Sequence, residues 1–166
     1  MSSFCMCKSD IYQIVRSARL IYNRLMKITA KNPRKDLEIL KKKLTQEQYN
    51  ICFLKGTEPA FSGKYTHHKD RGTYVCMVCN ESLFTSNSKF ESNTGWPSFD
   101  EVIEKGNIKL EDDHSLGMTR KEVLCANCNA HLGHVFDDGP TKMPDGKEAT
   151  GKRYCINSCA LKFKGK

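Results

Sequence analysis

The chain has 166 residues and a formal net charge of +8 at pH 7. No run of about 18 apolar residues occurs in it, which excludes a transmembrane helix. The positive charge is local, because residues 1–43 hold 11 Lys or Arg against 3 Asp or Glu, while residues 44–166 hold 16 of each. Nucleic-acid binding typically needs clustered Lys and Arg, so the balanced body argues against a nucleic-acid partner.

The first predicted element is a basic amphipathic helix within residues 11–27. Apolar side chains recur on one helical face, and Arg and Lys lie opposite. This pattern is typical of a mitochondrial presequence or a membrane-surface helix, and equally of a solvated helix docked on the domain. Pro33 ends the segment, because proline disfavours helix in the residue before it. We therefore expect a basic leader or N-terminal extension over residues 1–43, and an intracellular protein that is mitochondrial or cytoplasmic.

A short helix is expected to start at Thr45, because Thr45 and Gln48 form a capping box. After Gly56 the chain changes to short β-type runs separated by Gly, Pro, Asn and Asp clusters. Three of these runs are Thr73–Val78, Lys121–Leu124 and Arg153–Ile156. The sequence predicts a mainly antiparallel β domain over residues 44–166, with short N-terminal helices.

The nine cysteines are spaced as metal ligands and reactive thiols. No apolar secretory segment precedes them, so we expect reduced thiols rather than disulfides. Four of them form two C-x-x-C knuckles, namely Cys76 with Cys79 and Cys125 with Cys128. Four thiolates suit one tetrahedral Zn²⁺ in a closed, structural site that would clamp two distant hairpins together. The alternatives are two independent redox motifs, or a ligand role for His131 or His134 after the second knuckle.

Cys155 lies in the last β-type run, between a cation and an amide. Arg153 and Asn157 are two residues away on either side, so both would share the strand face of Cys155. Nearby positive charge lowers the pKa of a cysteine and favours the nucleophilic thiolate. A cysteine between Tyr and Ile is nevertheless more often a small buried hydrophobe, and these residues alone leave both interpretations open.

Several longer motifs bear on this choice. In chain order they are Thr45-Gln-Glu-Gln-Tyr49, Gly56-Thr-Glu-Pro59, Phe61-Ser-Gly63, Gly95-Trp-Pro-Ser-Phe99, His131-Leu-Gly-His-Val-Phe136 and Arg153-Tyr-Cys-Ile-Asn-Ser158. Together with both cysteine knuckles, they resemble the peptide methionine-R-sulfoxide reductases of the B type. The resemblance covers the chain from Leu44 to the C-terminus and adds nothing to residues 1–43.

The resemblance implies a compact, zinc-clamped domain of two small antiparallel sheets that reduces free or protein-bound methionine-R-sulfoxide. Cys155 would attack the sulfoxide sulfur and become a sulfenic acid. The family positions that orient the substrate and assist proton transfer are His131, His134 and Asn157. Trp96 matches the ring that packs on the S-methyl group, and we group Arg153 with it as a substrate-binding residue. Thioredoxin is the expected reductant of a monomeric enzyme.

This chain departs from the family pattern at Thr94, where many members carry the resolving cysteine. An external thiol could reduce Cys155 directly, or another cysteine could replace the missing one; the candidates are Cys159, Cys52 and the tail cysteines Cys5 and Cys7. If residues 155–159 continue as a strand, their end Cα atoms lie about 13 Å apart, beyond the ~7 Å limit for a disulfide. We therefore favour direct reduction, or resolution by Cys52 or a tail cysteine, over a bond to Cys159.

The main rival interpretation is a zinc-ribbon binding module without catalysis, since four-cysteine zinc domains often bind nucleic acid or protein. A third is a redox-sensing zinc protein that has lost its activity. The intact set of Cys155, Trp96 and the two histidines favours the enzyme.

Overall fold

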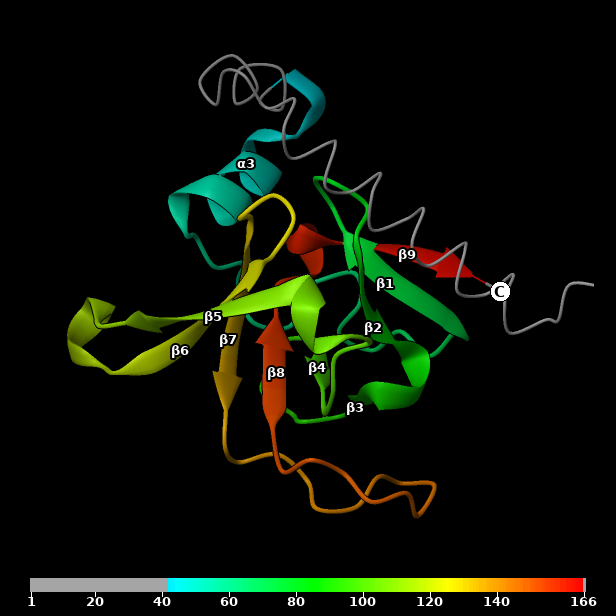
Figure 1. Ribbon diagram of the computed structural model, residues 1–166. Helices are drawn as coiled ribbons and strands as arrows, with labels where there is room; N and C mark the ends of the chain where they lie inside the picture. Colours follow the sequence, from blue (N-terminus) through cyan, green and yellow to red (C-terminus); the bar gives the residue numbers. More distant parts are fainter. Residues whose placement is uncertain (1–41, 166) are drawn as a thin grey trace, which may run out of the picture. The chain divides into compact units, whose positions relative to one another are not determined.

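The computed structural model describes residues 42–165 of the chain (Figure 1). The basic helix predicted within residues 11–27 lies outside the described residues, as does the leader except for Lys42 and Lys43. Among residues 42–165, no helix is long and apolar enough to cross a membrane.

One antiparallel sheet has three strands, in the order β2-β1-β9. These strands are β1 (Gly72–Cys76), β2 (Ser82–Thr85) and β9 (Leu161–Gly165). The strand predicted over Thr73–Val78 ends at Cys76, because Met77 and Val78 belong to the turn of the first cysteine knuckle.

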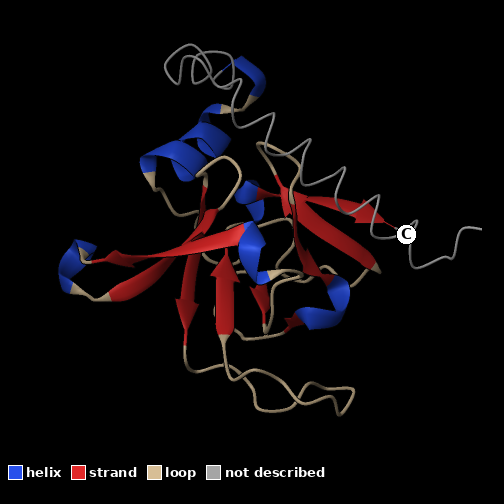
Figure 2. Ribbon diagram, in the orientation of Figure 1, coloured by secondary structure: helices blue, strands red, loops and turns tan. Residues whose placement is uncertain are grey.

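The other antiparallel sheet has six strands, in the order β3-β4-β8-β7-β6-β5. These are β3 (Lys89–Phe90), β4 (Ser98–Phe99), β5 (Ile108–Asp113), β6 (Arg120–Cys125), β7 (His131–Phe136) and β8 (Arg153–Ile156). The predicted run Arg153–Ile156 coincides with β8, and the run Lys121–Leu124 lies within β6. The expected fold, mainly β with two antiparallel sheets, is confirmed, and this second sheet is larger than expected. β8, which carries Cys155, lies inside the sheet between β4 and β7 (Figures 1 and 2).

Four short 3-10 turns connect the strands. They are η1 (Ser86–Ser88), η2 (Lys105–Asn107), η3 (Ser115–Gly117) and η4 (Ser158–Ala160). η4 follows β8 after a single intervening residue, so the chain turns immediately past the strand of Cys155.

The predicted helix is α3 (Gln46–Leu54), and its start has the predicted capping box. The Thr45 hydroxyl accepts from the Gln48 N–H at 3.2 Å, and the Gln48 side-chain oxygen accepts from the Thr45 N–H at 3.0 Å. The helix ends at Lys55, whose φ of 57° is left-handed and whose N–H donates to the Asn50 carbonyl. α3 packs against β7 and η4, and it buries its own residues Ile51 and Cys52.

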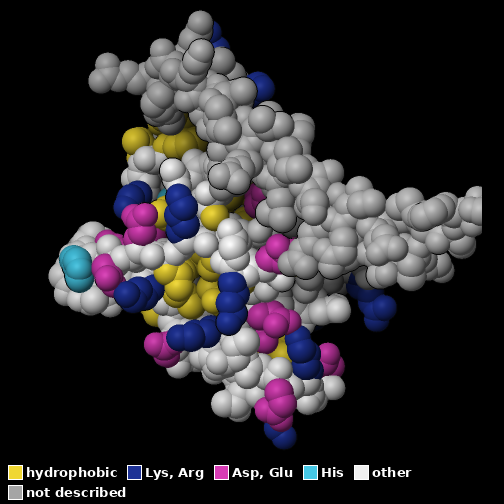
Figure 3. Space-filling view, in the orientation of Figure 1, with side chains coloured by type: hydrophobic (Ala, Val, Ile, Leu, Met, Phe, Trp, Pro, Cys, Tyr) yellow, Lys and Arg dark blue, Asp and Glu magenta, His cyan; other side chains and the backbone are white. Residues whose placement is uncertain are grey.

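Aromatic rings from both sheets form the centre of the core. The rings of Phe84 and Phe99 stack with centroids 4.4 Å apart, and Tyr74 meets Phe99 edge-on at 5.0 Å. Tyr154 on β8 also contacts Phe84, at 5.9 Å. Because successive side chains on a strand alternate between faces, Cys155 points away from the face that carries Tyr154 and Ile156. On the side of the molecule shown in Figure 3, apolar side chains gather near the middle and charged side chains of both signs border them.

Candidate active site

Cys155 stands in a row of polar residues that crosses one face of the six-stranded sheet. The strand register pairs Cys155 with Ser98 on β4 and with His134 on β7. His134 in turn pairs with Glu122 on β6. Residues directly opposite one another in antiparallel strands share a face, with Cβ atoms about 4.5–5.5 Å apart. The fold therefore brings four residues that are distant in sequence into one line.

His131 joins this row through an irregularity in β7. Residues three apart, such as His131 and His134, would face opposite sides of a regular strand. The pairing with β6 shifts register at Leu132, which is an extra residue of the β-bulge type. The bulge brings the two imidazoles together, with ring centroids 5.5 Å apart. The two histidines that the motif predicted as functional are thus adjacent.

His131 is buried and held by a carboxylate. Its Nδ1 lies 2.7 Å from Glu122 Oε1, and Glu122 Oε2 lies 2.7 Å from Lys55 Nζ. Burial lowers the pKa of His131, although the hydrogen bond with Glu122 opposes the shift. The second ring nitrogen of His131, Nε2, is buried and has no hydrogen-bond partner among the described residues. The resting imidazole is therefore neutral near pH 7 and keeps one nitrogen unengaged.

His134 has a different and more exposed carboxylate partner. Its Nε2 lies 2.7 Å from Asp113 Oδ2, and the same oxygen accepts from Arg120 at 2.8 Å. Hydrogen bonds from Ser115 hold the pKa of Asp113 below its usual range, with smaller contributions from His134 and Arg120. Asp113 is thus ionised at neutral pH, and each histidine of the pair has its own carboxylate.

The Cys155 thiol is half-buried and next to Thr94, whose hydroxyl lies 3.9 Å from the sulfur. Burial raises the pKa of Cys155, while Thr94 and Arg153 act in the opposite direction. The expectation that positive charge favours the thiolate is therefore outweighed by desolvation in the resting protein. Arg153 is itself held by two 2.8 Å hydrogen bonds to Asp138 and lies 4.4 Å from the centre of the Phe136 ring.

Asn157 lies one residue past the end of β8, with an extended backbone whose N–H donates to the Leu132 carbonyl at 2.8 Å. Its side-chain oxygen accepts from the Glu58 N–H at 3.1 Å, and its side-chain amide donates to the Leu132 carbonyl at 3.1 Å. The carboxamide thus connects backbone groups on both sides of the site.

Glu58 is a site residue that sequence reasoning missed. It is 3% exposed, and its carboxylate accepts from the N–H groups of Ser158 and Cys159 at 2.6 and 2.9 Å. Its carbonyl accepts from the indole N–H of Trp96 at 3.0 Å. Glu58 therefore ties the turn after β8 to Trp96. The only sequence signal for this role was its place in the motif Gly56–Pro59.

The four knuckle cysteines form one cluster, in which all four sulfurs lie within 4.8 Å of one another. Cys76 and Cys128 sulfurs are 3.6 Å apart, and those of Cys79 and Cys125 are 3.5 Å apart. Four sulfurs bound tetrahedrally at ~2.3 Å from Zn²⁺ would be about 3.8 Å apart, so the donor set fits this metal. Among the described residues, no histidine belongs to the cluster.

The two knuckles have the same local structure. In each, the residue after the second cysteine, Asn80 or Asn129, has a positive φ, and its N–H donates to the carbonyl of the first cysteine. One knuckle follows β1 and the other follows β6, so the cluster joins the two sheets.

The remaining cysteines of the described residues are poor nucleophiles. Cys52 is 1% exposed, and burial raises its pKa to about 12. Burial and a hydrogen bond with Glu58 raise the pKa of Cys159 to about 12. The premise that residues 155–159 form one strand is wrong, because η4 begins at Ser158. Strand geometry therefore does not exclude Cys159, but its neighbouring carboxylate disfavours the thiolate.

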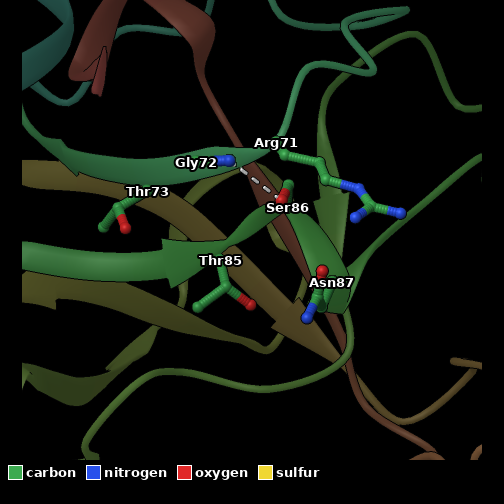
Figure 4. Close-up of a pocket in the computed structure, with 6 residues that line it drawn as sticks. All are labelled: Arg71, Gly72, Thr73, Thr85, Ser86 and Asn87. Carbon is green, nitrogen blue, oxygen red and sulfur yellow. Dashed lines mark hydrogen bonds between the residues drawn. The ribbon is translucent and has the colours of Figure 1, made fainter. Parts of the chain in front are cut away.

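A cavity of 150 Å³ lies elsewhere, on the three-stranded sheet (Figure 4). Arg71, Thr85 and Asn87 are among its lining residues, and none of them is a predicted site residue. The cavity therefore plays no part in the arrangement around Cys155.

Comparison with known proteins identifies the domain. The SelR domain family matches residues 44–165. The mouse protein "Methionine-R-sulfoxide reductase B3, mitochondrial" is 54% identical over 124 residues, which are 75% of this chain and 46% of the mouse protein. "Peptide methionine sulfoxide reductase MsrB" of Methanosarcina barkeri is 51% identical over 130 residues, covering 78% of this chain and 87% of the relative. The protein of the same name from Pseudomonas fluorescens is 54% identical over 127 residues, covering 76% of this chain and 92% of the relative.

The chain thus spans about half of the mouse relative and most of the two microbial ones. The range matched by the family, residues 44–165, includes both knuckles and every motif from Thr45 to Ser158, which favours an enzyme over a non-catalytic zinc-ribbon module. The chain belongs to the methionine-R-sulfoxide reductase B family, and it is an oxidoreductase that reduces methionine-R-sulfoxide.

Proposed function

We propose that Cys155 is the nucleophile of this reductase and becomes a sulfenic acid in each turnover. The observation that carries the proposal is the row in which Cys155 lies directly opposite His134, with His131 beside it. The Cys155 sulfur attacks the sulfoxide sulfur, and the oxygen moves from the substrate to Cys155. The sum is thiol plus sulfoxide giving sulfenic acid plus thioether, so the cysteine sulfur loses the two electrons that the substrate sulfur gains.

The step requires movement of one proton. Cys155 is protonated at rest because burial raises its pKa, whereas the attacking species is the thiolate. A neutral histidine can accept the thiol proton and return it to the sulfoxide oxygen as the sulfur–oxygen bond breaks. His131 meets this need, since it is neutral at rest and has a free Nε2. We assign His134 the neighbouring role of orienting the sulfoxide oxygen.

Trp96 and Arg153 form the proposed binding groups for the substrate. Trp96 is partly exposed, and its indole N–H donates to the Glu58 carbonyl, which restrains the orientation of the ring. An aromatic face held in this way suits the methyl group on the substrate sulfur. Arg153 contributes positive charge near the thiol, which favours the thiolate during attack. Asn157 acts as a positioning residue through its bonds to Glu58 and Leu132.

We propose that Cys76, Cys79, Cys125 and Cys128 hold one Zn²⁺. The fit of the sulfur cluster to tetrahedral geometry supports this proposal. When bound, the metal supplies folding free energy by joining the two sheets. Four thiolates leave no open coordination position, so the site is structural.

Recycling is the step for which this chain departs from the common pattern. The low reactivity of Cys52 and Cys159 supports direct reduction of the Cys155 sulfenic acid by an external thiol. With thioredoxin, one thiol condenses with the sulfenic acid to form a mixed disulfide and water, and the second thiol displaces Cys155. Cys5 and Cys7 lie outside the described residues and stay alternative resolving thiols. The mitochondrial or cytoplasmic compartment and the monomeric state also stay predictions.

The decisive experiment measures methionine formed from each sulfoxide epimer with dithiothreitol as reductant. We expect the wild-type protein to consume the R epimer and leave the S epimer, and Cys155→Ser to form no methionine. Cys159→Ser is the matched control and should keep most of the wild-type rate. Retained activity in Cys155→Ser would show that the nucleophile is misassigned.

A further inference from the structure

Glu122 is a buried carboxylate at a strand position where an apolar residue is more usual. It is 1% exposed in the middle of β6, where burying a charge is unfavourable unless it is paired. Its register partner on the edge strand β5 is Glu111, and like charges directly opposite one another destabilise a sheet. An apolar residue at this position would avoid both costs, so the carboxylate calls for a functional explanation.

The two oxygens of Glu122 make two strong contacts of different kinds. Oε1 lies 2.7 Å from Nδ1 of the buried His131, and Oε2 lies 2.7 Å from the ammonium group of Lys55. An ionised carboxylate only accepts hydrogen bonds. The proton of the neutral His131 ring must therefore be on Nδ1, which leaves the lone pair on the unpartnered Nε2.

Lys55 reaches Glu122 because of the way α3 ends. The left-handed conformation of Lys55 terminates the helix, and its side chain is 64% exposed, so the ammonium group stays partly hydrated. Glu122 raises the pKa of Lys55 chiefly through their hydrogen bond. The ammonium group of Lys55 places a positive charge against the Glu122 carboxylate without being fully desolvated itself. Lys55, Glu122 and His131 thus form a chain from the protein surface to the site.

We propose that Glu122, held by Lys55, is a positioning residue that sets the tautomer of His131 and stabilises its imidazolium form. The inference rests on the proposed function, in which His131 accepts the Cys155 proton at Nε2 and returns it to the sulfoxide oxygen. During that transfer His131 carries a positive charge next to Glu122. His134, which pairs with Asp113, has no such buried carboxylate and is not expected to depend on Glu122.

The first test observes the His131 tautomer in the resting, zinc-loaded protein by long-range ¹H–¹⁵N NMR. We expect His131 to carry its proton on Nδ1 in the wild type. In Glu122→Gln, the neutral amide can donate as well as accept, so both tautomers should become populated. Lys121 and Asp112 form an exposed ion pair on the neighbouring strands, so Asp112→Asn is the matched control and should leave the His131 signals unchanged.

The second test measures kcat and KM with methionine-R-sulfoxide and dithiothreitol. Glu122→Gln should lower kcat on the order of tenfold or more with little change in KM, because general acid–base catalysis typically contributes 10²–10⁴-fold. Lys55→Met should also lower kcat, by a smaller factor than Glu122→Gln does. Lys55→Arg keeps the positive charge and should have a kcat close to that of the wild type. Lys55 is exposed enough that neither change threatens folding.

The outcomes separate this inference from the proposed function. A wild-type protein that does not reduce the R epimer would contradict the proposed function. Wild-type His131 protonated on Nε2, or a Glu122→Gln variant with wild-type kcat, would overturn the inference even if the reductase activity is present. If Glu122→Gln loses zinc or melts at a lower temperature, Lys55→Met becomes the test. An unchanged kcat in Lys55→Met would then contradict the inference.

Discussion

At the scale of single residues, the reactivity of Cys155 depends on opposing effects of burial and charge. Burial keeps the thiol protonated at rest, and Arg153 favours the thiolate. Arg153 in turn is fixed by Asp138 and by the Phe136 ring. The resting thiol is therefore mostly protonated and reacts slowly with oxidants.

The charge of Arg153 leads to a prediction about pH. Arg153 lowers the pKa of Cys155, so Arg153→Met should raise the pKa of this thiol. The increase in thiol reactivity with pH should then occur at higher pH. The rate of Cys155 alkylation by iodoacetamide as a function of pH measures this without substrate. Lys152→Met removes the adjacent, exposed cation and should leave the profile in place. An unshifted profile in Arg153→Met would contradict the electrostatic role.

Thr94 offers a second prediction, because its hydroxyl lies 3.9 Å from the Cys155 sulfur, at the position where the family resemblance leads us to expect a resolving cysteine. Thr94→Cys should allow an intramolecular disulfide with Cys155 after one turnover. Titration of free thiols after one equivalent of methionine-R-sulfoxide should then show two thiols lost per chain, compared with one in the wild type. Ser92→Cys, next to Thr94, serves as the control. A loss of only one thiol in Thr94→Cys would show that the two sulfurs cannot meet.

At the scale of elements, the bulge in β7 determines which side chains share the site. Gly133 follows the extra residue with a φ of 155°, and a Cβ there would lie 2.1 Å from the Cys155 carbonyl oxygen. The strands carrying the histidines and the nucleophile approach each other closely only because this position lacks a side chain.

Gly133→Ala should therefore push β7 and β8 apart and lower the free energy of unfolding by about 3 kcal/mol or more. Thermal or urea unfolding measures the loss. Gly106→Ala is the matched control, since nothing lies within 4 Å of its added Cβ. If the two variants unfold alike, the close packing at Gly133 is not needed for the fold.

The same elements show how far sequence reasoning reaches. The capping box at Thr45 and the strand Arg153–Ile156 could be predicted, because both depend on local chemistry. The position of Asn157 could not, since its partners Glu58 and Leu132 are distant in sequence. Glu122 was also missed, because a Glu between Lys121 and Val123 is indistinguishable in sequence from an exposed strand residue. Its burial arises only when α3 and β7 pack beside it.

At the scale of the whole molecule, the cysteine cluster brings the two sheets together, since one knuckle follows β1 and the other follows β6. Cys76→Ser should remove one of four ligands, lower the zinc content and lower the melting temperature by roughly 10 °C or more. Metal analysis and calorimetry measure both effects. Cys159→Ala, which alters a thiol outside the cluster, should retain the metal. Full zinc content and unchanged melting in Cys76→Ser would argue against the four-thiolate site.

The strand order also has a consequence for the synthesis of the chain. All four clustered cysteines lie at or before Cys128, whereas β8 and β9 are made afterwards, and β8 must insert between β4 and β7. Proteins fold from the N-terminus as they leave the ribosome. The four clustered cysteines and the two histidines of a nascent chain therefore leave the ribosome before Cys155 does. The oxidisable thiol of Cys155 is thus the last of these groups to emerge, and a chain that stops before β8 should be inert toward sulfoxides.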